Sequence, residues 1–174
     1  MADSYDVEIS GDYDGIDFEA IASEELDRAA VRTVNEWTEN MREAGYRNTG
    51  DTINSVTWEA PSALERLVGS DRIAALIGEV GRAPGSGHPN VDQLGDWVHE
   101  QAGLPDRGTT VEWEFDGETQ TVTFDQAVYL IGRAIDANGL PAHRFGSRAL
   151  QTVGPEFEQR LAQRLQEAID EQSL

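Results

Sequence analysis

The longest regular pattern in the sequence is an apolar stripe that begins near Phe18 and ends at Gly45. Apolar residues recur along it every three to five positions: Ile21, Leu26, Ala30, Val34, Trp37, Met41 and Ala44. Such spacing is typical of a helix with one buried face, and Gly45 stands where a C-terminal cap is expected. We therefore predict a long N-terminal helix, with Trp37 as a core anchor, onto which other elements pack.

Strand patterns follow in shorter segments. Residues 53–60 are predicted as a strand closed by Pro61, and residues 64–68 as a second strand or a short helix. Alternation on both sides of Asp116-Gly117 predicts a hairpin over residues 110–124, because that pair suits a tight turn with positive φ.

Three further helices are expected. One begins at Val91 and ends near Gly103, one covers residues 125–138, and the last covers residues 155–174, where apolar residues are spaced by four. Residues 73–77 form an apolar run that is too short to assign by periodicity alone.

The chain shows no internal repeat and no linker, and 174 residues are enough to bury one core. We predict a single α+β domain over residues 1–174. In it, a small and mostly antiparallel sheet packs against the long N-terminal helix and further helices. Residues 1–17 form a polar N-terminal segment with one candidate strand at Val7–Ile9.

The charge balance is strongly acidic. Asp and Glu total 33 against 13 basic residues, all of them Arg, for a net charge of −20, and the acids are spread along the chain. This composition indicates a folded protein adapted to molar salt, where the Debye length is about 3 Å and like charges repel little. An extreme halophile, or a virus that infects one, is the expected source, and the charge argues against specific nucleic-acid binding.

Other classes of protein are excluded by composition. The chain has no cysteine, so neither disulfides nor thiol catalysis are expected. No apolar run is long enough to span a bilayer, and the N-terminus has neither the basic start nor the apolar core of a signal peptide. We expect a soluble protein made in the cytoplasm.

No segment carries a catalytic or metal-binding signature. The acidic stretch 12–19 lacks the Gly and Glu that a calcium loop needs at its sixth and twelfth positions. His88, His99 and His143 lack zinc-site spacing, and Ser86 lies between glycines without the spacing of a nucleophile elbow. We assign no catalytic, metal or cofactor-binding residue and predict that the protein is not an enzyme, although a carboxylate pair would be invisible among so many acids.

Two loops are stiffened by glycine and proline. The first, Gly81–Pro89, has three Gly and two Pro in nine residues, which predicts neither helix nor strand ladder and a high cost of ordering without a partner. The second follows Asn138, where Asn-Gly can supply a left-handed cap and Leu140 is extended by the following Pro141. Phe145 is predicted as the buried aromatic plug that anchors this loop.

These loops belong to three segments with a recognisable order. Thr49-Gly50-Asp51-Thr52-Ile53-Asn54-Ser55-Val56 follows the long helix. Gly81-Arg82-Ala83-Pro84-Gly85 comes next, with His88-Pro89, Leu94 and Trp97-Val98 behind it. The third segment contains Ile135, Gly139-Leu140-Pro141-Ala142, Phe145 and Ala149-Leu150.

In this order and spacing the segments resemble the tail-completion (neck) protein family of long-tailed viruses. The family patterns are Thr-Gly-x-Leu-x-x-Ser-Ile, then Gly-Arg-x-Pro-Gly followed by a Leu-x-x-Trp-Val helix, then Gly-x-x-x-x-Pro-Phe-x-x-x-Ala-Leu. The chain departs from them at Thr52, where an apolar residue is usual, and at Arg144, where the family often has Pro. The hairpin over 110–124 is also longer than the usual connection.

The resemblance implies a structural virion protein that forms a ring, expected to be hexameric, at the head–tail junction. The ring would join the head-side connector or stopper protein to the tail-terminator and tail-tube proteins. Genome DNA would pass through its channel without specific binding. The protein would belong to the virion of a haloarchaeal-type virus, assembled in the host cytoplasm, with no membrane contact and no cofactor.

The loops supply the candidate interface residues: Thr49, Gly50, Gly81, Arg82, Pro84, Gly85, His88, Pro89, Leu140, Pro141, His143 and Arg144. Core anchors are Trp37, Trp97 and Phe145, of which the last two are predicted to be buried away from any ligand. Arg82 is expected to bind acids of an adjacent chain, and the 81–89 loop to be mobile until assembly.

Three alternatives remain open. A tail-terminator protein of the same virion region shares the general features. A small hydrolase that depends on a metal or on carboxylates would show one deep pocket with convergent polar groups, whereas a ring subunit would show flat, extended interfaces. A cellular acidic binding module would be a monomer.

Overall fold

The computed structural model describes residues 15–45, 51–92, 94–95, 108, 110–115 and 118–172. Its helices are α1 (Phe18–Glu43), α2 (Asp51–Asn54), α3 (Ile73–Val80), α5 (Phe124–Asn138) and α6 (Phe145–Gln172). Its strands are β1 (Thr57–Ser62), β2 (Glu65–Gly69), β3 (Thr110–Phe115) and β4 (Glu118–Thr123). The predicted α+β class is confirmed. The candidate strand at Val7–Ile9, the Asp116-Gly117 turn and the helix end near Gly103 lie outside the described residues.

The predicted long N-terminal helix is confirmed as α1. It begins where the Asp17 side chain accepts a hydrogen bond from the backbone N–H of Ala20 at 2.9 Å, which satisfies one free donor of the first turn. It ends before Gly45, whose φ of 79° is the left-handed conformation typical of a helix end.

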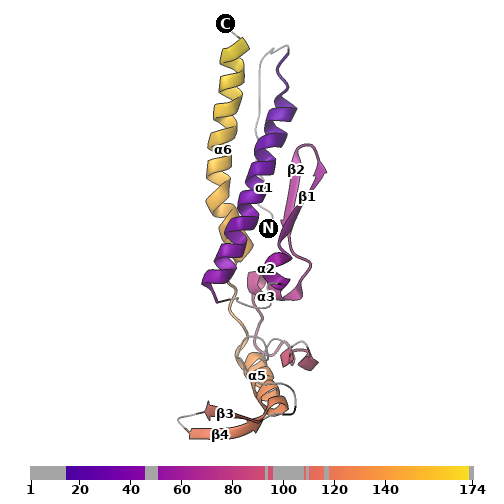
Figure 1. The fold of residues 1–174 in the computed structure, drawn as a ribbon, viewed down its shortest axis with the longest axis vertical. Helices are drawn as coiled ribbons and strands as arrows, with labels where there is room; N and C mark the ends of the chain where they lie inside the picture. Colours follow the sequence, from indigo (N-terminus) through magenta and orange to yellow (C-terminus); the bar gives the residue numbers. More distant parts are fainter. Residues whose placement is uncertain are drawn as a thin grey trace.

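Helix α6 lies side by side with α1 along much of the molecule (Figure 1). The sequence predicted that this helix begins at Pro155, and that prediction is wrong, because α6 begins ten residues earlier at Phe145 and passes through Pro155. Pro155 is exposed, so water can satisfy the carbonyl that lacks its N–H partner. Burial of Ala149 and Val153 on one side of it and Leu161 on the other keeps the helix continuous.

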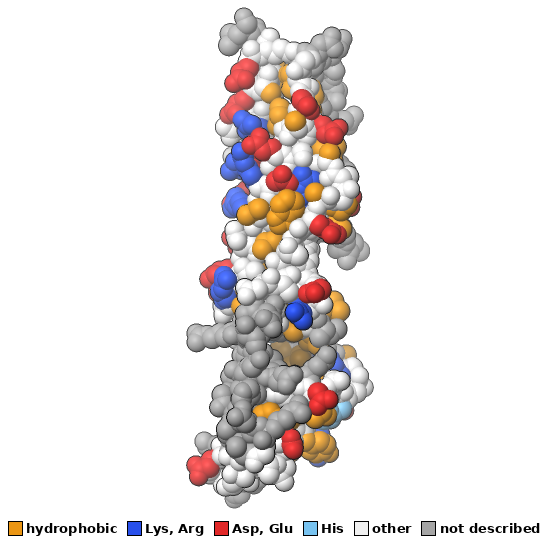
Figure 2. Space-filling model, turned by 45° about the vertical axis from the view of Figure 1, so that its right-hand side comes forward, with side chains coloured by type: hydrophobic (Ala, Val, Ile, Leu, Met, Phe, Trp, Pro, Cys, Tyr) orange, Lys and Arg blue, Asp and Glu red, His pale blue; other side chains and the backbone are white. Residues whose placement is uncertain are grey.

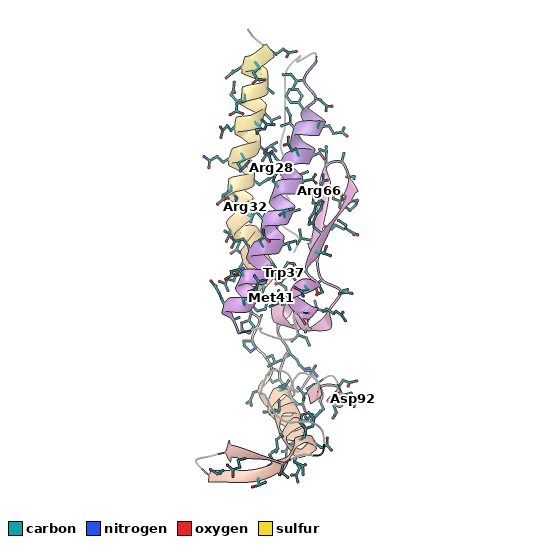
Figure 3. The ribbon with its side chains drawn as sticks, viewed as in Figure 1. Arg28, Arg32, Trp37, Met41, Arg66 and Asp92 are labelled. Carbon is teal, nitrogen blue, oxygen red and sulfur yellow. The ribbon has the colours of Figure 1, made fainter. Side chains whose placement is uncertain are left out.

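A row of ion pairs, the ionic ladder, links α1 to α6. The Glu25 side chain is 1% exposed and accepts hydrogen bonds from Arg28 of its own helix at 2.5 Å and from Arg160 of α6 at 3.1 Å. Arg164 bridges from α6 to Glu24 at 3.3 Å, and Arg32 pairs with Glu156. Figure 3 shows Arg28 and Arg32 on α1 beside α6.

The β1–β2 hairpin packs against the other side of α1 (Figure 1). Arg66 of β2 donates to Asp27 of α1 at 2.5 Å and lies over the Trp58 ring, which ties hairpin to helix. The strand predicted over 53–60 is wrong at its start, because Ile53 lies in the short helix α2 and is buried. Pro61 does not close β1 either. The pairing shifts register between Glu59 and Ser62, so the missing N–H of Pro61 is tolerated there.

The second hairpin is confirmed but forms a sheet of its own. Strands β3 and β4 pair in antiparallel register from Thr110↔Thr123 to Phe115↔Glu118. Among the described residues the sheets have two strands each, so the single sheet predicted is divided, and only β1–β2 packs on α1. Thr123 ends β4 and begins α5 with a reciprocal capping box to Gln126, which fixes the hairpin against the helix.

The elements follow one long axis and bury two apolar clusters (Figure 1). The upper cluster contains Met41, Ile53, Val56 and Phe145, with Val34, Trp37 and Val68 against it. The lower cluster contains Leu94, Phe124 and Val128, with Ile131 and Ile135 against it. The polypeptide between the two clusters forms the junction described next.

Candidate assembly surface: the loop junction

The two glycine- and proline-containing loops pair with each other. The backbone N–H of Arg82 donates to the Leu140 carbonyl at 2.8 Å, and the N–H of Leu140 donates back to the Arg82 carbonyl at 2.8 Å. This bridge follows the C-terminal caps of α3 and α5, which are Gly81 and Gly139. The first loop has neither a helix nor a strand ladder, as predicted, and Arg82 forms an isolated bridge.

Both glycines are required by this close approach. Gly81 has φ 74° and ψ −169°, and Gly139 has φ 73° and ψ −169°, a region that is almost restricted to glycine. A Cβ at position 139 would lie 2.3 Å from the Arg82 carbonyl oxygen, and one at position 81 would lie 2.8 Å from the Leu140 oxygen. The backbones could not meet with any larger residue at either position.

The rest of the first loop is fastened to α5. Gly85 donates its N–H to the Asp136 carbonyl at 2.7 Å, and Gly87 donates to the Asp136 carboxylate at 2.9 Å. The His88 ring stacks on Tyr129 with centroids 5.8 Å apart, above Gly132, where a Cβ would collide with the imidazole. Helix α5 of the same chain therefore holds this loop, while its contact with a neighbouring chain stays a prediction.

Arg82 also serves the loop itself. Its Nη2 donates to the Gly87 carbonyl at 2.6 Å, which closes the loop on its own side chain. Its Nε is buried and has no hydrogen-bond partner among the described residues. The Arg82 side chain is therefore occupied in part within its own loop, and its predicted contact with an adjacent chain stays a prediction.

The second loop is fixed at the start of α6. The Glu79 carboxylate accepts hydrogen bonds from the N–H groups of Gly146 at 2.7 Å and Ser147 at 3.1 Å, and from the Ser147 hydroxyl at 2.5 Å. A carboxylate at a helix N-terminus satisfies free donors and complements the helix dipole. The His143 N–H donates to the Gly78 carbonyl at 2.8 Å, so α3 holds both ends of this turn.

Phe145 is fully buried, which confirms its predicted role as an anchor. The His143 ring stacks on it with centroids 5.1 Å apart and planes 2° from parallel. Trp37 is partly buried against the same cluster and covers Gly146, where a Cβ would lie 2.8 Å from the indole ring. Figure 3 places Trp37 and Met41 together at the lower end of α1.

Arg144 has a positive φ of 54°, the one non-glycine residue with this property in the described part of the chain. Proline is locked near φ −65° and could not adopt this conformation. A proline at position 144 would require a different backbone conformation.

Most of the candidate interface residues meet at this junction: Gly81, Arg82, Pro84, Gly85, His88, Pro89, Leu140, Pro141, His143 and Arg144. Thr49, Gly50, Trp97 and His99 lie outside the described residues. Sequence reasoning missed Glu79, Tyr129 and Asp136, which hold the loops. In a chain with 33 acids, nothing in the local sequence distinguishes those two carboxylates.

Large apolar side chains are exposed beside the junction and on the first hairpin. Leu76 is 55% exposed, Val80 65% and Leu140 36%, on segments that contact one another, while Leu64 and Leu67 are exposed on the hairpin. Figure 2 shows apolar side chains between acidic ones on the upper part of the molecule. An open hollow on this hairpin is lined by apolar side chains together with polar and charged ones, namely Asn54, Ser55, Thr57, Trp58, Glu59, Leu67, Val68, Gly69, Ser70, Asp71 and Arg72.

The described part of the chain contains no group of three or more acidic, histidine or cysteine side chains that could hold a metal ion. None of its helices combines the length and apolar character that crossing a bilayer requires.

Together the fold and the junction define an α+β protein whose two apolar clusters are connected by a pair of interlocked loops. Comparisons with models of protein families, with curated proteins and with solved structures found no match to this chain.

Proposed function

We propose that this protein is a ring-forming structural subunit of a virion neck, placed at the head–tail junction of a long-tailed virus of a halophile. In this role it performs no catalysis. It packs against copies of itself around the genome channel and contacts connector or stopper proteins on one side and tail-terminator and tail-tube proteins on the other.

The observation that carries the proposal is the surface the chain leaves uncovered. In the described part of the chain, Leu76 is 55% exposed, Val80 65% and Leu140 36%, on segments that contact one another beside the loop junction. A ring subunit has two neighbours, and a standard interface covers about 800 Å² on each partner. These exposed side chains supply apolar surface for such interfaces.

The two loops support the same role. The segments that resemble the family motifs are far apart in the sequence, and each of them requires a glycine where they meet. Because the two loops can approach each other only if both have a glycine at the contact, the two motifs are expected to occur together. The net charge of −20 suits a channel wall, since a wall that offers few cations to phosphates lets DNA slide.

The proposal is tested by assembly in molar salt. We expect the purified full chain to sediment as a closed oligomer and to appear as rings with a central channel by negative-stain electron microscopy. A serial dilution separates a defined ring from aggregation, because only a ring gives one species of fixed size. A protein that remains a monomer at every concentration in molar salt would contradict the proposal.

A further inference from the structure

Most arginines in the described part of the chain are already occupied. Seven of them pair with acids of the same chain: Arg28, Arg32, Arg42, Arg66, Arg72, Arg160 and Arg164. Arg82 is bound within its own loop. The side chains of Arg133, Arg144 and Arg148 form no ion pair with any described residue, although acids outnumber bases by more than two to one.

Arg144 and Arg148 form a pair with a local cost. They lie one turn apart at the start of α6, where the Arg148 N–H donates to the Arg144 carbonyl at 2.9 Å, and both are exposed. Both side chains are cations at a helix N-terminus, where positive charge is unfavourable. Arg144 also has a φ of 54°, which strains any residue with a Cβ.

The Glu79 carboxylate satisfies N–H groups of the same first turn, but no described residue forms an ion pair with either arginine side chain. Uncompensated departures from local rules are expected at functional sites. The pair borders the junction, where Leu140 and Val80 are exposed, so a partner seated here would cover apolar surface and meet two free guanidinium groups. Such a partner should be acidic, and a surface with a net charge of −20 belongs to every other copy of this chain.

We propose that Arg144 and Arg148 are the cationic half of the contact between neighbouring copies, and that they bind carboxylates on a helix surface of the second copy. This inference rests on the proposed ring and names the residues that hold it together. Because an arginine patch on one copy meets an acidic surface elsewhere on the next, the contact is head-to-tail, the kind that can close into a ring. Paired guanidinium–carboxylate hydrogen bonds act at contact distance, so they persist in molar salt that screens longer-range attraction.

The test compares charge reversals in the full-length chain. We expect the double variant Arg144→Glu/Arg148→Glu to keep the helical circular dichroism of the wild type in molar salt. Its assembly should require roughly tenfold to a hundredfold more protein, as measured by sedimentation velocity. The single reversal Arg148→Glu should weaken assembly by roughly tenfold. Arg133→Glu is its matched control, since it changes the net charge equally and Arg133 is also exposed and unpaired among the described residues but lies on α5. It should assemble as the wild type does.

A single-site probe gives a second measurement. The chain has no cysteine, so an Arg148→Cys variant can be labelled at one position with a benzophenone photo-crosslinker. Mixed with unlabelled wild-type protein, it should cross-link to an acid-rich peptide of another copy, which mass spectrometry identifies. If the double variant does not fold, Arg148→Gln takes its place and should weaken assembly by roughly tenfold.

The outcomes separate this inference from the proposed function. Rings that form equally well with the double variant overturn the role of Arg144 and Arg148 and leave the ring proposal intact. Equal loss of assembly in Arg133→Glu overturns it too, because the effect would then be one of total charge. A wild-type protein that is a monomer throughout overturns both.

Discussion

Gly81 and Gly139 make possible the close approach of the two loops in the middle of the molecule. Each ends a helix, and each has a positive φ with an extended ψ that residues with a Cβ rarely adopt. Each also lies against the backbone of the other loop. Gly85 has a similar φ of 71° but no atom within 4 Å of its absent Cβ, so the chain itself offers a matched control.

We expect Gly139→Ala to lower the free energy of unfolding by about 2–4 kcal/mol, because it combines backbone strain with a collision at the Arg82 carbonyl. Gly85→Ala should cost about 1–2 kcal/mol, since it carries the strain alone. Urea unfolding in molar salt, followed by circular dichroism, measures both. Equal costs for the two variants would show that the close approach of the loops contributes nothing to stability.

Apolar packing and one buried carboxylate hold helices α1 and α6 together. Glu25 is buried beneath Arg28, Arg160 and Arg164, whereas Glu24 binds Arg28 and Arg164 at the surface with half of its side chain exposed. Two adjacent glutamates therefore share two arginines and differ mainly in burial.

We expect Glu25→Gln to destabilise the protein by about 2–4 kcal/mol, because the arginines around it would lose a charged acceptor within a desolvated contact. Glu24→Gln should cost no more than about 1 kcal/mol, since exposed ion pairs contribute little and salt screens them. Thermal unfolding of the two variants in molar salt makes the comparison. A larger loss for Glu24→Gln would contradict the assignment of the ladder's strength to the buried carboxylate.

Pro155 gives a second prediction for α6. It deprives the Gln151 carbonyl of its helical donor and is exposed, so it offers the core no packing. Pro155→Ala should therefore stabilise the helix by about 1–3 kcal/mol, which raises the melting temperature by about 2–4 °C for each kcal/mol. A lower melting temperature would indicate that the packing of α6 on α1 depends on the proline.

The elements predicted correctly from the sequence are those with local signals. The stripe of α1, the capping box of α5 and the alternation of the second hairpin each lie within one short window. The misjudged features depend on distant partners. Ile53 becomes helical because it is buried under α1, and α6 passes through Pro155 because it packs on α1.

In the candidate site too, features with a local sequence signal were predicted, and features that depend on distant contacts were not. Glycine and proline identified both loops, and Phe145 was identified as an anchor, because turn chemistry and an isolated aromatic residue are visible locally. The pairing of the two loops, by contrast, depends on a contact between residues far apart in the chain. The sequence contains no local sign of such contacts.

For the molecule as a whole, the net charge determines how much salt the fold requires. With 33 acids and 13 arginines, the folded chain repels itself wherever salt does not screen it. We expect the fold or the oligomeric state to be lost as salt falls from molar to physiological concentration. A melting and sedimentation series in NaCl, repeated in KCl to separate screening from specific ion binding, measures this. A melting temperature that does not change with salt would contradict halophilic adaptation.

The bridge between Arg82 and Leu140 also has a consequence for chain topology. The polypeptide leaves the upper cluster at one of these residues and returns at the other, and the two are hydrogen-bonded neighbours. The segment between Arg82 and Leu140, with its own apolar cluster and hairpin, is thus an insertion into the part of the molecule that contains α1 and α6. It enters and leaves that part at one point. Such an insertion can lengthen, shorten or be exchanged without moving the α1–α6 pair. Divergence between related proteins should therefore concentrate in the inserted segment, while the two glycines at its ends stay fixed.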